Sequence, residues 1–114
     1  MQFLLLIYDQ EKRWTKLSEV QQNSETQEYG DFGKEFAKAI CGANALQPTP
    51  TAKTVRVRNG KHQVTDGPSA ETKEQLGGYY LVEAKDSDEA IAIAAKIPWA
   101  RHGSIEVRPI MTFS

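Results

Sequence analysis

The chain has 114 residues, of which 39% are hydrophobic and 25% are charged, a composition typical of one soluble globular domain. Its 14 Lys and Arg residues nearly balance 15 Asp and Glu residues, giving a net charge of -1, which argues against the basic surface of a nucleic-acid binder. The single cysteine, Cys41, excludes an intrachain disulfide, and no Cys/His cluster has metal-ligand spacing. We therefore expect no metal, no cofactor and a reducing, cytoplasmic setting.

The longest apolar run, residues 3–8, is too short for a bilayer span, which needs about 20 residues. It also lacks the basic region and cleavage site of a secretory leader, so we expect no membrane segment. Because both odd and even positions of this run are apolar, it predicts a central strand covered on two faces.

Residues 14–40 have apolar side chains at helical spacing, which predicts a first helix in one or two pieces that ends at Cys41-Gly42. Capping boxes fit at Ser18/Gln21 and Ser24/Gln27, and the polar stretch 21–28 could hold a break. The two prolines of residues 47–51 predict an extended connection without helix.

A β-hairpin is predicted around Asn59-Gly60, the preferred pair for a type I′ turn. Residues 54–58 and 61–65 alternate polar and apolar, which pairs Val57 with His62 and Val55 with Val64. One face of the hairpin is then apolar and the other is basic.

The rest of the chain predicts a helical turn within 69–75, a strand at 79–83, a helix from Asp86 to Pro98 and a strand at 104–108. This order indicates one α+β domain, residues 1–114, with a ferredoxin-like antiparallel sheet, an extra β-hairpin and both helices on one face. Because the first strand is apolar on two sides, we expect a second copy to cover the face that the helices leave open.

The densest polar cluster lies between two predicted strands, where functional loops are common. Asp66 could transfer protons from a cleft or, alternatively, accept N–H groups of its own Asx turn. Glu71 and Lys73 could assist it or belong to a solvated charged turn. Gly77 and Gly78 could admit a ligand or mark a bulge. Arg56 and Arg58 could hold a carboxylate or form surface ion pairs. The candidate catalytic residues are Asp66, Glu71 and Lys73, and the candidate pocket residues are Gly67, Pro68, Arg56, Arg58, Gly77, Gly78 and Tyr79.

The segments Val-Thr-Asp-Gly-Pro at 64–68 and Glu-Thr-Lys-Glu-Gln-Leu-Gly-Gly-Tyr-Tyr at 71–80 resemble the YCII-related proteins, in particular the subgroup named for an Asp-Gly-Pro-Phe motif. The resemblance extends over nearly the whole chain and implies a dimeric α/β-barrel assembly of ferredoxin-like chains. One family member is a dehydrochlorinase, and a His/Asp pair is the suspected chemistry of the wider family. Residues 18–40 contain no histidine and Ser69 replaces the motif phenylalanine, so that pair is not carried over.

The leading hypothesis is a homodimer with a small-molecule pocket near Asp66-Gly67-Pro68 and general acid/base chemistry, of the lyase or isomerase kind, on a small anionic substrate. The alternative is a non-catalytic regulatory module that works with a sigma factor or the transcription machinery. We expect no nucleic-acid partner and no membrane partner. Whether the chain is an enzyme stays open at this point.

Overall fold

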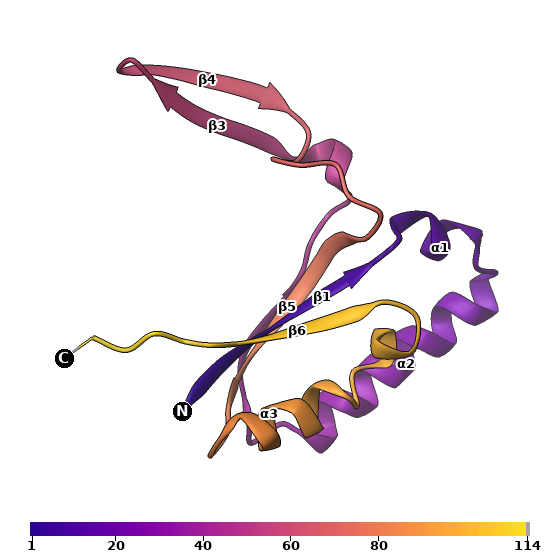
Figure 1. The fold of residues 1–114 in the computed structure, drawn as a ribbon. Coiled ribbons are helices and arrows are strands. Elements are labelled where there is room, and N and C mark those ends of the chain that lie inside the picture. The colour runs from indigo at the N-terminus through magenta and orange to yellow at the C-terminus, as the bar shows by residue number, and fades with distance from the viewer. Residues whose placement is uncertain (114) are drawn as a thin grey trace.

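The computed structural model describes residues 1–113 and contains a four-stranded antiparallel sheet in the order β2-β5-β1-β6. Helices α2 and α3 lie on one face of this sheet (Figure 1). The predicted ferredoxin-like α+β fold is confirmed. The elements are β1 (Gln2–Asp9), α1 (Glu11–Lys16), α2 (Glu19–Glu35), β2 (Ile40–Ala45), η1 (Thr49–Thr51), β3 (Lys53–Arg58), β4 (Lys61–Asp66), β5 (Gln75–Glu83), α3 (Ser87–Ala94), η2 (Pro98–Arg101) and β6 (Ser104–Pro109).

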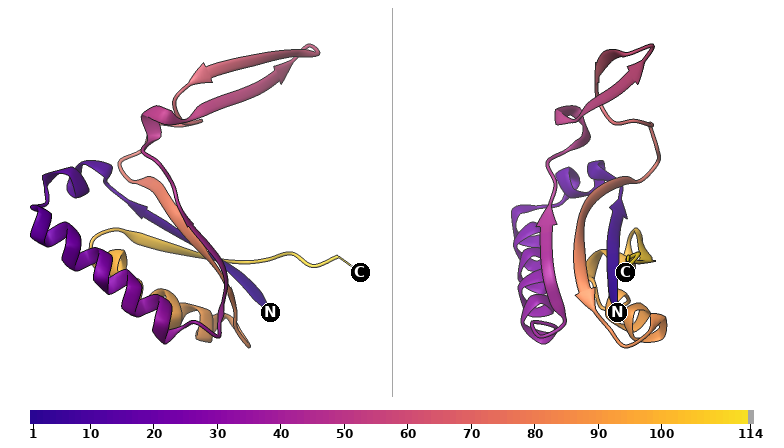
Figure 2. Two further views of the ribbon diagram at one scale, coloured as in Figure 1. Left: turned by 180° about the vertical axis from the view of Figure 1, so that it is seen from behind. Right: turned by 90° about the vertical axis from the view of Figure 1, so that its left-hand side faces the viewer.

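The central strand β1 alternates between the two faces of the sheet. Phe3 and Leu5 are fully buried against the helices, whereas Leu6 and Tyr8 are only half-buried on the other side. Within residues 1–113 no helix covers that second face (Figure 2). We call it the open face; by strand register it carries Leu4, Leu6, Tyr8, Tyr79, Leu81, Ser104, Glu106 and Arg108.

The hairpin forms as predicted, with Val57 opposite His62 and Val55 opposite Val64. Asn59 and Gly60 have φ angles of 54° and 74°, as a type I′ turn requires. The hairpin does not join the main sheet. It projects as a separate two-stranded sheet (Figures 1 and 2). We call residues 53–66 the arm and the remainder of the chain the body.

The fourth strand of the main sheet is β2, and the prediction that this region ends a helix is wrong. Helix α2 ends at Glu35, and Ile40 already pairs with Val82 of β5. β2 contains Gly42, Ala43, Asn44 and Ala45, which are residue types with low strand propensity. It forms a strand because its backbone pairs with the backbone at the edge of β5, not because its own sequence favours a strand.

The first helical region consists of two pieces, but the break lies at Leu17 and Ser18. The suggested break within 21–28 is wrong, because those residues lie inside α2. Ser18 accepts a hydrogen bond from the Gln21 backbone N–H at 3.1 Å, and the Gln21 side chain accepts one from the Ser18 N–H at 2.9 Å. The second capping box is wrong, because Ser24 lies inside α2. Residues 69–74 form no helical turn, and β5 begins at Gln75 rather than at 79. The proline connection includes a short 3₁₀ turn, η1.

Candidate functional site

A hollow of about 650 Å³ opens on the open face, where β1 ends and β6 begins. Its volume is within the range of small-molecule sites. Strand β1 contributes its last open-face side chain, β6 contributes its first residues, and the loop before β5 contributes the polar groups. The lining residues are Tyr8, Gln10, Thr72, Lys73, Glu74, Ser104, Ile105 and Glu106.

Hydrogen bonds hold the loop wall of this hollow in place. The Ser104 hydroxyl donates to Glu74 Oε1 at 2.6 Å, which ties the loop to β6. Gln75 joins it to α1, because its Oε1 accepts from the Glu11 N–H at 3.0 Å while its Nε2 donates to the Thr72 carbonyl at 2.7 Å. The wall therefore has a defined shape without a bound ligand.

Lys73 is the cation of the hollow. Among residues 1–113 it takes part in no ion pair or hydrogen bond, so its ammonium group is available to an anion. Two carboxylates stand in the same lining. Glu74 is bonded to Ser104, and Glu106 lies 3.4 Å from Arg108 on β6.

Asp66 ends β4, and its side chain is 82% exposed. Its carboxylate pairs with the Lys53 ammonium across the arm, and it receives no loop N–H in the part of the chain that the structure describes. The loop is held otherwise: the Gly67 N–H donates to the Ala52 carbonyl at 2.8 Å, and the Thr54 hydroxyl donates to the Gly67 carbonyl at 2.8 Å. Gly67 has φ +96°, a conformation that favours glycine.

The other candidate residues divide between the arm and the body. Arg56 contacts the Ser69 carbonyl at 3.5 Å, and Arg58 donates to the Val57 carbonyl at 3.0 Å. Glu71 is exposed in the loop after Pro68. The lining of the hollow includes Lys73 but neither Asp66 nor Glu71 nor the two arginines. The catalytic roles of Asp66, Glu71 and Lys73 and the binding roles of the two arginines stay predictions.

The glycine pair lies in β5, where the register of β1 and β5 shifts. A Cβ on Gly77 would meet Trp99 at 3.1 Å, and a Cβ on Gly78 would meet the Asn44 carbonyl at 2.9 Å. Both glycines therefore make room for other parts of the body, namely Trp99 and the Asn44 backbone. The neighbouring Tyr79 accepts a hydrogen bond from Asn44 Nδ2 at 2.8 Å.

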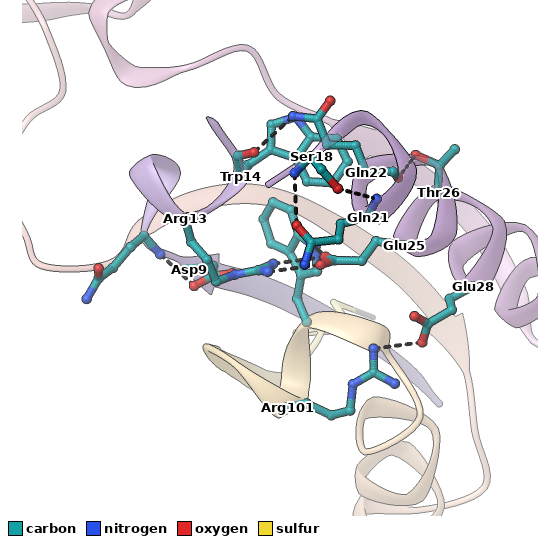
Figure 3. Close-up of polar contacts among 12 residues, drawn as sticks. Asp9, Arg13, Trp14, Ser18, Gln21, Gln22, Glu25, Thr26, Glu28 and Arg101 are labelled. Atoms are coloured by element: carbon teal, nitrogen blue, oxygen red, sulfur yellow. Dashed lines mark hydrogen bonds and ion pairs between the residues drawn. The ribbon is translucent and has the colours of Figure 1, made fainter. Parts of the chain in front are cut away.

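Sequence reasoning missed a buried charge network that includes Asp9, the residue between Tyr8 and Gln10 of the hollow (Figure 3). Arg13 of α1 donates from Nε to Asp9 at 2.6 Å and from both terminal nitrogens to Glu25 at 2.9 and 3.0 Å. Trp99 donates to Glu25 at 2.9 Å, and its ring lies 5.5 Å from the Arg13 guanidinium carbon. One signal in the sequence could have indicated this network. Asp9 lies on the same face of β1 as the buried residues Phe3, Leu5 and Ile7, and it precedes Arg13 by four residues.

The electrostatics of this network oppose proton transfer. Hydrogen bonds from Arg13 lower the pKa of Glu25, and the bond to Glu25 raises the pKa of Arg13. Burial raises the pKa of the adjacent Tyr29. All of these groups keep their ordinary charge states near neutral pH. The network thus positions the end of β1, and with it Tyr8 and Gln10 of the hollow.

A second hollow of about 360 Å³ lies between α2 and the segment 95–101. Its two cations are already paired: Arg101 contacts Glu28 at 2.7 Å (Figure 3), and Lys96 contacts Glu35 at 3.9 Å. It therefore offers an anionic ligand less free positive charge than the hollow at Lys73.

Residues 1–113 contain no group of three or more His, Cys, Asp or Glu arranged to hold a metal ion. Within the same residues no helix is long and apolar enough to cross a membrane.

Comparison with known proteins places this architecture in a family. The chain resembles an uncharacterised protein of Rhizobium meliloti (strain 1021), with 46% identity over 70 residues; the match covers 60% of this chain and 56% of the length of that relative. The structure resembles 5-chloro-2-hydroxyhydroquinone dehydrochlorinase (TftG) from Burkholderia phenoliruptrix AC1100, solved in complex with 2,5-dihydroxybenzoquinone. That similarity has a TM-score of 0.59 and 13% identity, and it covers 97% of this chain and 94% of the other. The model of the YCII-related domain matches residues 1–114, so the chain belongs to the YCII-related family.

Proposed function

We propose that the protein is a homodimeric enzyme that performs general acid/base chemistry, of the lyase or isomerase kind, on a small anionic ring compound. The observation that carries the proposal is the Lys73 ammonium, which has no ion-pair partner among residues 1–113 and lies in a hollow of small-molecule size. A cation on a concave surface with hydroxyl and carboxylate neighbours is suited to an acidic, hydroxylated ligand. The structural neighbour TftG is a dehydrochlorinase, and elimination of hydrogen chloride is a lyase-type reaction.

We assign the roles of Lys73, Asp66 and Glu71 from the contacts that each side chain makes in the structure. Lys73 would hold the anionic group of the substrate. The Glu74 carboxylate accepts a hydrogen bond from the Ser104 hydroxyl, and Asp66 pairs with Lys53. We assign proton transfer to Asp66 or Glu71; neither lines the hollow of its own chain, so either must approach it from the loop or from a second copy.

The homodimer is supported by the excess surface of the single chain. A compact monomer of this size exposes about 6,200 Å², whereas this chain exposes 8239 Å². Its radius of gyration is 16.2 Å, against about 13 Å for a compact domain of this length. The excess is comparable with what one subunit buries in an obligate dimer, roughly 1,000 to 2,500 Å².

The ligand proposal is tested by thermal unfolding with 2,5-dihydroxybenzoquinone as the first probe, followed by small phenolic carboxylates. A ligand at 100 times its Kd stabilises by about 2.7 kcal/mol, a shift on the order of 10 °C in the midpoint. We expect this shift in the wild-type protein and its loss in Lys73→Met. Lys34→Met, which removes an exposed lysine from α2, is the matched control and should keep it. The absence of a shift across the series, or an equal shift in both variants, would refute the site.

A further inference from the structure

The arm carries an apolar face that its own chain leaves uncovered. Val55, Val57 and Val64 are 61%, 56% and 61% exposed. They are neighbours on one face of the hairpin, since Val55 pairs with Val64 and Val57 pairs with His62. We call this the valine face. Three clustered valines in water on a two-stranded sheet indicate a missing contact.

Asp66 lies on this valine face. It pairs with Lys53, two residues from Val55, and it is itself two residues from Val64. Residues two apart on a strand share a face. Whatever covers the valines also approaches the Asp66 carboxylate, which in the single chain lies outside the hollow.

The body holds the base of the arm in a fixed position. Glu11 accepts hydrogen bonds from the Thr49 N–H at 2.7 Å and from the Thr49 hydroxyl at 2.9 Å. The Leu46 N–H donates to the Gly77 carbonyl at 2.9 Å. From this base the arm extends over the side of the sheet opposite α2 and α3, so that the arm and the open face enclose an angular space (Figure 1).

The charges of arm and body are complementary. The arm contains four of the 14 Lys and Arg residues but one of the 15 Asp and Glu residues, which makes it net positive by three and the rest of the chain net negative by four. The hollow itself contains two carboxylates and one lysine. By strand register Arg56, Arg58 and Lys61 lie on the face of the hairpin opposite the valine face, so this charge difference attracts the arm of one chain toward the body of another without forming the contact itself.

We propose that in the homodimer the valine face of each arm packs on the open face of the other copy, and that Asp66 of one copy thereby serves the hollow of the other. Leu4, Leu6 and Leu81 supply the apolar surface that receives the valines. This inference rests on the homodimer proposed above and adds that the site is incomplete in one chain. The area that a stable dimer needs agrees with the excess exposed surface of the chain.

Cross-linking between two variants tests the arrangement. In a Cys41→Ser background, one chain carries Val64→Cys on the arm and the other carries Glu106→Cys at the hollow. The two are co-expressed and treated with a short bismaleimide. We expect a covalent heterodimer from the mixture. Val20→Cys, on an α2 residue that is 77% exposed, replaces Val64→Cys as the control and should give none.

The other outcomes separate the two proposals. Dimers in sedimentation without the Val64–Glu106 cross-link would overturn the arm contact and leave the homodimer standing. Monomers at all concentrations would overturn both. Cross-linking inside a single chain that carries both cysteines, at a concentration where it is monomeric, would show that the arm folds back on its own body and would also overturn the proposal.

A substitution on the valine face supplies an independent measure. Val57→Lys should raise the dimer dissociation constant at least tenfold while the circular dichroism of the body is unchanged, because Val57 is mostly exposed in the single chain. Val20→Lys makes the same chemical change on α2 and should leave the constant unaltered. Equal constants for Val57→Lys and the wild type would overturn the arm contact.

Discussion

The body and the arm both contain antiparallel strands, but the apolar residues of these strands have different surroundings. Phe3 and Leu5 of β1 are fully buried, whereas Val55 and Val64 of the arm are each 61% exposed. The arm pairs its strands because Asn59 and Gly60 supply the two positive φ angles of its turn. Local sequence is therefore enough to pair two strands, while tertiary packing must supply their stability.

The ion pairs differ in the same way. In the body, Asp9 and Glu25 have side chains only 3% and 11% exposed and share Arg13. In the arm, Lys53 and Asp66 are 64% and 82% exposed. A buried charge that loses its partner is costly, whereas an exposed pair contributes little. Substitutions in the body should consequently act on global stability, and those in the arm should act on local order and on association.

The largest effect is expected at Gly103 in the body. A Cβ at this position would lie 1.9 Å from the Tyr8 carbonyl oxygen and 3.0 Å from the Asp9 Cα, and backbone cannot move away as a side chain can. Gly103→Ala should lower the free energy of unfolding by about 4 kcal/mol or more, measured by urea denaturation.

The control is Gly30→Ala in α2, where a Cβ meets nothing within 4 Å. This change should leave stability unaltered or raise it by up to about 1 kcal/mol, since alanine has the better helix propensity. If Gly103→Ala were as stable as the wild type, β1 and the loop before β6 would not pack as described.

The next largest effect is expected at Arg13. Arg13→Met leaves Asp9 and Glu25 buried without their cation, which should cost about 3 kcal/mol. The matched change in the arm, Lys53→Met, should cost less than about 1 kcal/mol. Denaturant unfolding of both variants compares them directly, and equal losses would contradict the difference drawn between the two ion pairs.

Acid should weaken the body through Glu25. Its pKa is lowered in the folded chain by Arg13, so the ionised form stabilises the fold. This contribution is full above the ordinary carboxyl pKa of about 4.3 and is lost as the pH falls through the lowered folded value. Between pH 5 and pH 2, the unfolding free energy of Glu25→Gln should fall less steeply than that of the wild type. If the unfolding free energies of Glu25→Gln and the wild type had the same dependence on pH, the pKa of Glu25 would not be lowered in the folded chain.

The sequence predicted those parts of the fold that strong local signals define. The Asn59-Gly60 turn set the hairpin register, and the Ser18/Gln21 capping box marked the start of α2. It did not predict β2, because Gly42 and its small neighbours have no strand pattern and are placed by pairing with β5. The separate position of the arm was not predictable for a similar reason, because a hairpin pattern determines which residues pair but not where the hairpin packs.

The candidate site was only partly accessible to sequence reasoning. Lys73 was chosen from a polar loop and does line the hollow, but the opposite wall comes from Tyr8 and Ser104, which are 96 residues apart in sequence and adjacent in the sheet. The network of Arg13 and Glu25 joins α1 to α2, and no spacing in the chain predicts such a contact between helices.

The smallest effect is expected at the tip of the arm. Gly60 has φ +74°, and an alanine in this conformation costs about 1 kcal/mol. Because the arm is a separate sheet, Gly60→Ala should raise amide exchange in residues 53–66 about fivefold and leave exchange in β1 and β5 unchanged. Hydrogen exchange with mass spectrometry resolves the two regions. A matching rise in the body would mean that the arm contributes to the stability of the whole chain, whereas a change confined to the arm supports the distinction between locally paired strands and globally packed ones.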